Sequence, residues 1–228
     1  MNTVLILNYL TDLEQNNCRD WYHGHKEEYK AANAEFEALI QELILRIGVT
    51  DSSILHNEPK DLTFRLTRDT RFSHDKSPYN PAFRAHIAPM GKLPVPVGYY
   101  LMIKPGGRSF LGGGLFADMF KDATSMIRDH IAKHPDRWET VITAPGFTKN
   151  FTVSGTSLKN VPAGYDKTHP QAQYLKYKSW YLEYPISDEL LCSPEDFLAL
   201  AADVFTQMQP FNRFLNTALD GFKMPERP

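Results

Sequence analysis

The sequence is short of cysteine. It contains only two, Cys18 and Cys192, which lie far apart, and it has no Cys-x-x-Cys pair. Two distant thiols do not form the disulfide framework that is typical of small secreted proteins. This scarcity favours a reducing, cytoplasmic setting.

Long hydrophobic runs are also lacking. The first residues hold one short apolar run, 4–7, which has no basic lead and is too short for the core of a signal peptide. No apolar run approaches the roughly 20 residues that a membrane-spanning helix needs. We therefore expect a cytoplasmic protein with no membrane partner.

Neither sign of charge is in excess. The 25 Lys and Arg residues and 27 Asp and Glu residues give a net charge of −2. No global field then favours DNA, RNA or an anionic membrane, so nucleic acid is a disfavoured partner and any basic function must be local. The 42% apolar and 23% charged content is that of an ordinary globular protein. Because we find no internal repeat and no linker, we predict a single domain over residues 1–228.

Common catalytic and cofactor motifs are missing as well. The sequence contains no Gly-x-Ser-x-Gly nucleophile motif, no P-loop and no dinucleotide fingerprint. The pairs His74-Asp75 and His23-Gly-His25 have no recognised metal spacing. We therefore assign no metal, while the cofactor stays unknown and whether the protein is an enzyme stays open.

One stretch, residues 64–87, concentrates positive charge. Apolar and polar residues alternate over 62–67 and again over 83–87, which predicts a strand on each side of a loop rich in Ser, Asp, Asn and Pro. Only Asp69 and Asp75 oppose the cations of the stretch. These cations are Arg65, Arg68, Arg71, Lys76 and Arg84.

Two interpretations of this basic stretch stay open. Arginine carries a planar fork of N–H donors that matches a carboxylate or a phosphate, so convergent arginines suit an anionic ligand. Alternatively, internal ion pairs hold the loop in place, Arg68 with Asp69 or Arg71 with Asp75.

The rest of the pattern predicts an α+β fold with a mainly antiparallel sheet packed against several helices. Apolar residues at three- and four-residue steps predict a long N-terminal helix over 18–47. Ser193-Pro194-Glu195-Asp196 predicts the start of a long C-terminal helix, which Pro210 ends or kinks. Further strands are predicted at 98–104, 109–115 and 179–186, the first two antiparallel because their connection is short. A short hairpin is predicted at 146–158.

Three consecutive glycines, Gly112-Gly113-Gly114, end the strand predicted at 109–115. Glycine allows a backbone to approach a ligand closely, which makes Gly113 a candidate for ligand contact. The alternative, which we favour, is a bend of the strand against another element.

Several short motifs follow one another along the chain. They include Asn16-Asn17-Cys18-Arg19-Asp20-Trp21-Tyr22, Arg68-Asp69-Thr70-Arg71-Phe72-Ser73, Pro78-Tyr79, Gly98-Tyr99-Tyr100, Phe110-Leu111-Gly112-Gly113-Gly114 and Phe211-Asn212-Arg213-Phe214-Leu215. In these motifs the chain resembles, nearly from end to end, the mostly bacterial domain-of-unknown-function family 2461. His74 departs from a position that is usually basic in that family. The resemblance implies one α+β domain whose signature includes the arginine loop and the glycine run, and it implies no activity.

We expect the protein to bind an anionic small molecule through the basic loop, and catalysis on that molecule stays open. His86 and Asp69 are the candidate acid or base, since a histidine titrates near neutral pH. The alternative is a non-enzymatic interaction protein whose loop binds an acidic partner or nucleic acid. The predicted ligand-binding residues are Arg65, Arg68, Arg71, Lys76, Arg84, Tyr99, Tyr100 and Gly113.

Overall fold

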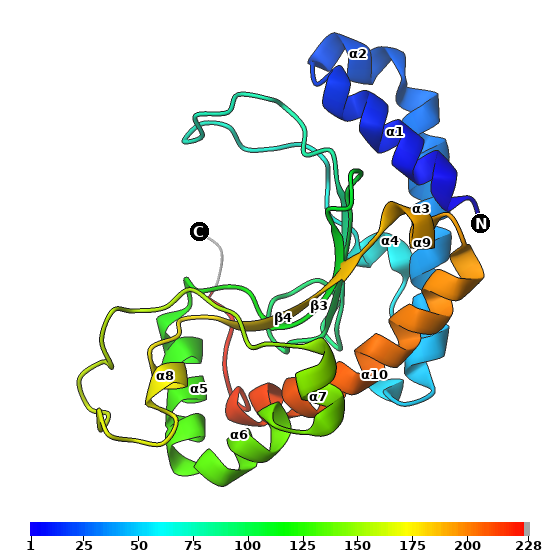
Figure 1. Ribbon diagram of the computed structural model, residues 1–228. Helices are drawn as coiled ribbons and strands as arrows, with labels where there is room; N and C mark the ends of the chain where they lie inside the picture. Colours follow the sequence, from blue (N-terminus) through cyan, green and yellow to red (C-terminus); the bar gives the residue numbers. More distant parts are fainter. Residues whose placement is uncertain (226–228) are drawn as a thin grey trace.

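A four-stranded sheet lies at the centre of the molecule (Figure 1), in a computed structural model that describes residues 1–225. Each strand pairs antiparallel with the next one along the chain. The strands are β1 (Phe83–Ile87), β2 (Tyr99–Ile103), β3 (Ser109–Leu115) and β4 (Trp180–Ile186). The predicted α+β class with an antiparallel sheet is therefore confirmed.

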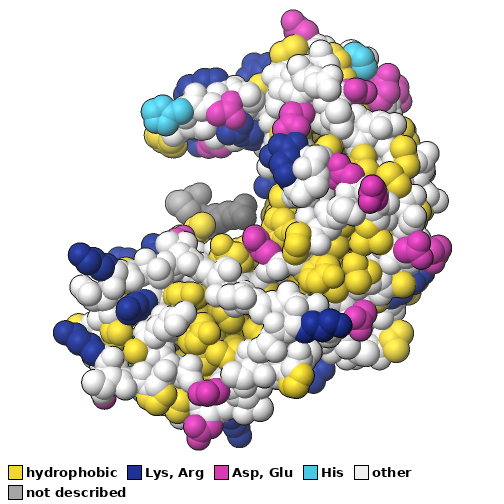
Figure 2. Space-filling model, viewed as in Figure 1, with side chains coloured by type: hydrophobic (Ala, Val, Ile, Leu, Met, Phe, Trp, Pro, Cys, Tyr) yellow, Lys and Arg dark blue, Asp and Glu magenta, His cyan; other side chains and the backbone are white. Residues whose placement is uncertain are grey.

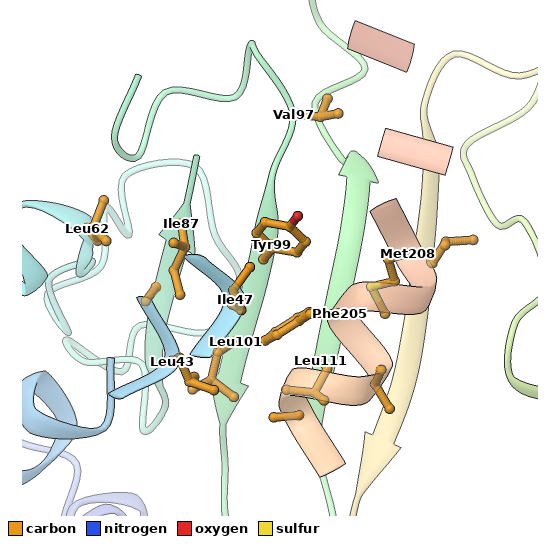
Figure 3. Packing of buried hydrophobic residues seen from close by; sticks show 14 of the residues in the cluster. Leu43, Ile47, Leu62, Ile87, Val97, Tyr99, Leu101, Leu111, Phe205 and Met208 are labelled. Atoms are coloured by element: carbon orange, nitrogen blue, oxygen red, sulfur yellow. The ribbon is translucent and has the colours of Figure 1, made fainter. Parts of the chain in front are cut away.

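Two long helices, α3 (Lys26–Gly48) and α10 (Pro194–Ala218), cover one face of this sheet (Figure 1). Successive side chains of a strand point to opposite faces, so every second residue of each strand meets these helices. Their contact forms the hydrophobic core. Figure 3 shows its central residues, which are Leu43 and Ile47 of α3, Phe205 and Met208 of α10, and Tyr99, Leu101 and Leu111 of the sheet.

Shorter helices surround this core. At the N-terminus, α1 (Thr3–Gln15) and α2 (Arg19–Gly24) pack beside α3. In the lower part of Figure 1, α5 and α8 lie to the left, and α6 and α7 contact α10. The remaining bounds are η1 (Ser52–Ile54), α4 (Pro59–Leu62), α5 (Lys121–Lys133), α6 (Pro135–Ile142), α7 (Pro145–Asn150), α8 (Ala172–Leu175) and α9 (Asp188–Leu191). In residues 1–225, no helix is both long enough and apolar enough to cross a bilayer.

The strand predicted over 62–67 does not form a continuous ladder. Pro59 instead begins the one-turn helix α4, because proline fits the first position of a helix. The chain then meets β1 at a single bridge through Thr63, and Thr67 bridges Tyr79 across the next segment. The basic loop, residues 67–80 from here on, therefore joins an irregular extended segment to β1 and does not join two strands.

Two other predicted elements differ from the structure, and of the end or kink predicted at Pro210 the structure excludes the end. The helix predicted over 18–47 is divided at His25 into α2 and α3. The hairpin predicted at 146–158 begins instead as α7, with Pro145 at its first turn. Pro210 does not end α10, because Phe205 and Phe211 on either side are fully buried. Their burial, about 1.5–3 kcal/mol each, offsets the cost of about 3 kcal/mol for an interior proline.

Candidate functional site

The sheet face that points away from α3 and α10 borders a hollow, which Figure 2 shows as a deep notch in the molecule. In Figure 1 the basic loop projects above this hollow, and α5 and α8 lie below it. Against the sheet lies a cavity of about 790 Å³, which we call the sheet-face pocket. Its lining includes Phe64, Arg84, His86, Lys92, Tyr100, Gly114, Phe116 and Phe120.

Strand register brings the side chains of this pocket together. Arg84 and His86 lie two residues apart on β1 and so share a face. His86 is paired with Tyr100 on β2, which in turn is paired with Gly112 on β3. A Cβ atom at Gly112 would lie only 2.9 Å from Cζ of Phe116. The first of the three glycines therefore makes room for an aromatic ring over the sheet.

Aromatic rings form one wall of the sheet-face pocket. The ring centroid of Tyr100 lies 5.3 Å from that of Phe116 and 6.3 Å from that of Phe64. Phe116 also stacks on Tyr181, with 4.5 Å between the centroids. These separations are typical of favourable aromatic pairs, so the wall offers a flat apolar surface to a ligand.

Two cations, Arg84 and Lys92, lie beside this wall. Cζ of Arg84 lies 5.5 Å from the ring centroid of Phe64, and its Nη2 donates to the carbonyl oxygen of Arg65 at 3.1 Å. Nζ of Lys92 donates to the carbonyl oxygen of Thr63 at 3.2 Å. Within residues 1–225, no carboxylate lies within 4.0 Å of either cation. Both are held in place by neutral groups, which leaves their charge available to an anion.

Burial shifts the pKa values of two further pocket residues, His86 and Tyr100. Desolvation lowers the pKa of His86 to about 4, although hydrogen bonds with the backbone of Lys92 and Leu93 oppose the shift. Burial also raises the pKa of Tyr100, and the nearby Arg84 offsets part of that rise. At neutral pH the pocket therefore presents a neutral imidazole and a neutral phenol beside two cations.

Cations of the basic loop are paired within the loop itself. Arg71 donates from Nε and Nη2 to the carboxylate of Asp69, at 3.0 and 2.7 Å. These hydrogen bonds lower the pKa of Asp69 to about 2. Arg68 forms an ion pair with Asp75, and Lys76 donates to a carbonyl oxygen of the loop at 3.0 Å. The loop thus satisfies much of its own charge.

The pairing in the loop differs from the two pairs suggested by the sequence. Oδ1 of Asp69 accepts a hydrogen bond from the backbone N–H of Arg71 at 3.1 Å, which forms a tight turn and brings these side chains together. Arg68 then pairs across the loop with Asp75. The predicted internal ion pairs are therefore present, but Arg68 pairs with Asp75 and Arg71 with Asp69.

The base of the loop is fastened to the N-terminal helices. The side-chain amide of Asn17 donates to the carbonyl oxygen of Tyr79 at 2.9 Å and accepts from its N–H at 3.1 Å. The ring of Tyr22 stacks on that of Tyr79, with 4.2 Å between the centroids. The motif at 16–22 is therefore the structural support of the basic loop.

The structure divides the predicted ligand-binding residues among three places. The sheet-face pocket contains Arg84 and Tyr100, with the acid–base candidate His86. The basic loop is the second place and holds Arg68, Arg71, Lys76 and the candidate Asp69, whereas the exposed Arg65 precedes the loop and does not line the pocket.

Tyr99 and Gly113 occupy the third place, on the helix-covered face of the sheet. Oη of Tyr99 donates to Oδ2 of Asp51 at 2.8 Å. A Cβ atom at Gly113 would lie 3.0 Å from Sδ of Met208 on α10, so this glycine permits close packing of the helix. Neither residue lines the sheet-face pocket.

Several residues of the pocket were not found from the sequence. Phe64 and Phe116 form its wall, and Lys92 supplies its second cation. The pairing of Gly112 with Tyr100 leaves space for the ring of Phe116 over the strand, but this pairing is known only from the strand register. Lys92 lies in a Pro- and Gly-rich connection without periodicity, so no local pattern marks it.

In residues 1–225, no group of three or more His, Cys, Asp and Glu side chains is placed to hold a metal ion.

The fold and this pocket define an α+β protein with one helix-covered sheet face and one open face that carries aromatic and cationic side chains. The chain belongs to the family described as a conserved hypothetical protein (DUF2461), whose model matches residues 5–214. No curated protein and no solved structure matches it. The family description names no activity, so function has to be argued from the site.

Proposed function

We propose that the sheet-face pocket binds a small molecule with a carboxylate or phosphate group and a flat apolar body. The observation that carries this proposal is the position of Arg84, without an acidic partner in residues 1–225, in a cavity of about 790 Å³ with an aromatic wall. A cavity of this volume lies within the usual range for small-molecule sites. Arginine pairs with carboxylates and phosphates, and the rings of Tyr100 and Phe116 stack on planar groups.

Binding is better supported than acid–base catalysis. A general base works best when its pKa lies near the working pH. The pKa of His86 is lowered to about 4 by burial, so its imidazole is a weak base at neutral pH. Asp69, the other candidate, is bound by Arg71 in the basic loop. The proposal therefore gives His86 the role of a neutral hydrogen-bonding group.

Calorimetric titration tests this proposal with two matched pairs of probes: benzoate against acetate, and phenyl phosphate against inorganic phosphate. We expect the aromatic member of at least one pair to bind more tightly. A hydrogen bond to a charged group contributes about 1.5–3 kcal/mol, so Arg84→Gln should weaken that binding about tenfold to hundredfold.

Arg65→Gln is the matched control, since the exposed side chain of Arg65 does not line the pocket and its carbonyl oxygen still accepts from Arg84. It should bind the probe as the parent protein does. Undiminished binding by Arg84→Gln would contradict the assignment.

One observation favours a second candidate, a protein that binds an acidic segment of another protein. Phe72 is 94% exposed near the tip of the basic loop, and Cζ of Arg71 lies 5.8 Å from its ring centroid. A large exposed ring beside arginine is typical of an interface anchor. For this candidate, partner binding is lost in Phe72→Ala and survives in Arg84→Gln.

A cytoplasmic setting forms part of the proposal. Both cysteines, Cys18 and Cys192, are free and exposed. Exposed free thiols are typical of a reducing compartment.

A further inference from the structure

A second cavity, of about 720 Å³, lies on the helix-covered side of the sheet, between the loop after α3 and the C-terminal half of α10. We call it the α10 cleft. Adjacent residues of β2 separate the two cavities, because Tyr100 faces the sheet-face pocket and Tyr99 lines the α10 cleft. The charged residues of the cleft are Asp51, Arg213 and Asp220.

Hydrogen bonds already hold the polar side chains of the α10 cleft in place. Oη of Tyr99 donates to Oδ2 of Asp51 at 2.8 Å. Nε2 of Gln209 donates to Oγ1 of Thr50 at 2.6 Å, and Oε1 of Gln209 accepts from Nη2 of Arg213 at 3.0 Å. Side chains that are ordered before binding lose less conformational entropy when a ligand arrives, which makes this arrangement suitable for recognition.

The cleft contains a carboxylate, that of Asp51, and a guanidinium, that of Arg213, and neither forms an ion pair. Within residues 1–225, no oppositely charged side chain lies within 4.0 Å of Asp51 or Arg213. Asp51 accepts hydrogen bonds from the neutral groups of Tyr99 and Ser53. Arg213 donates from Nη2 to the amide of Gln209, which leaves most of its N–H donors available.

We propose that the α10 cleft binds a small zwitterion, a molecule with both a carboxylate and an ammonium group such as a free amino acid. The guanidinium of Arg213 pairs with the carboxylate, and the carboxylate of Asp51 accepts from the ammonium. Asp220 adds a second acid, so the lining has one cation and two carboxylates. That balance disfavours a dianion such as a phosphate monoester and favours a ligand that brings its own positive charge.

Calorimetric titration of the full chain with each of the twenty common amino acids tests this proposal. For any amino acid that binds, the N-acetylated form lacks the ammonium and the amide form lacks the carboxylate. We expect each blocked form to bind about tenfold more weakly or worse, since each loses a charged hydrogen bond. If no amino acid binds at millimolar concentration, the proposal is wrong.

Two variants assign the two charges separately. Asp51→Asn keeps an oxygen that accepts from Tyr99 and removes the charge, so it should abolish the preference for the free amino acid over its N-acetylated form. Arg213→Gln, at an exposed position of α10, should abolish the preference over the amide. Arg65→Gln is the control, because its exposed side chain lines neither cavity, and it should leave binding unchanged.

The outcomes separate the two cavities. Preferences that persist in both Asp51→Asn and Arg213→Gln would overturn the zwitterion site. Loss of amino acid binding in Arg84→Gln would also overturn it, because the ligand would then occupy the sheet-face pocket.

Discussion

Gly114 lines the sheet-face pocket, and no side chain fits at this position without strain. Its φ is +93°, a conformation that other residues rarely adopt, and replacement by alanine costs about 1–2 kcal/mol for this reason alone. A Cβ atom would also overlap the carbonyl oxygen of Trp180 and lie 2.7 Å from Cε1 of Phe211. Because Trp180 belongs to β4, which pairs with β3, its backbone cannot withdraw without disturbing the sheet. Such overpacking costs about 1–3 kcal/mol.

The expected size of the effect follows from these terms. Alanine also has fewer conformations than glycine in the unfolded chain, and this difference stabilises the folded state by about 0.4–1 kcal/mol. We therefore expect Gly114→Ala to lower the free energy of unfolding by about 2–4 kcal/mol. Domains are typically stable by about 5–15 kcal/mol, so the variant should still fold.

Gly164→Ala is the matched control. Gly164 has a φ of +92°, and no atom lies within 4 Å of the position of its Cβ. It should therefore show the backbone cost alone, about 0–1.5 kcal/mol. Urea unfolding followed by tryptophan fluorescence measures both variants. Equal destabilisation would refute the reasoning from contacts with Trp180 and Phe211.

Two further predictions concern the base of the basic loop and the titration of the pocket. Asn17→Ala removes two hydrogen bonds to the backbone of Tyr79, and we expect it to lower the free energy of unfolding by about 1–3 kcal/mol. Hydrogen exchange in the basic loop should also accelerate, whereas the exposed Asn16→Ala should change neither quantity by a comparable amount. Folding lowers the pKa of His86 from the ordinary value of 6.5 to about 4. As pH falls between these two values, the imidazole binds a proton in the unfolded chain but not in the folded chain. The free energy of unfolding should therefore fall by about 3 kcal/mol over this pH range. His86→Gln lacks this titration, and its urea-unfolding free energy should fall less between pH 7 and pH 4; parallel pH profiles would contradict the assignment.

Part of the candidate site could be predicted from the sequence. Arg84 and His86 are correctly placed on one face of a strand, because side-chain direction alternates with every residue. The same rule separates Tyr99 from Tyr100, which the prediction had placed in one site. Arg84, Tyr100 and His86 meet only through the register of β1 and β2, which local patterns do not specify.

The glycine run shows the same division. Ligand contact at Gly113 or, as the favoured alternative, a bend of the strand against another element was predicted, and the structure gives each glycine a different neighbour. Gly112 makes room for Phe116, Gly113 allows close contact with α10, and Gly114 adopts a positive φ. Composition identifies the run, but the elements that pack above and below the sheet decide what each glycine does.

Local information in the sequence located the four strands of the sheet, the start of α10, the α+β class and the family, because periodicity, caps and short motifs act between residues that are near in the chain. The same local patterns also predicted a strand at 62–67 and a hairpin at 146–158 that the structure does not form. Contacts between distant segments depended on tertiary packing. Asp69 and Asp75 exchanged the arginine partners that proximity in sequence had suggested, because loop geometry decides which side chains meet. Gln209 reaches Thr50 across 159 positions only because α10 and the loop after α3 lie on the same face of the sheet. The α10 cleft follows from that arrangement, whereas the sheet-face pocket lies on the opposite face and follows from the register that brings Arg84, His86 and Tyr100 together.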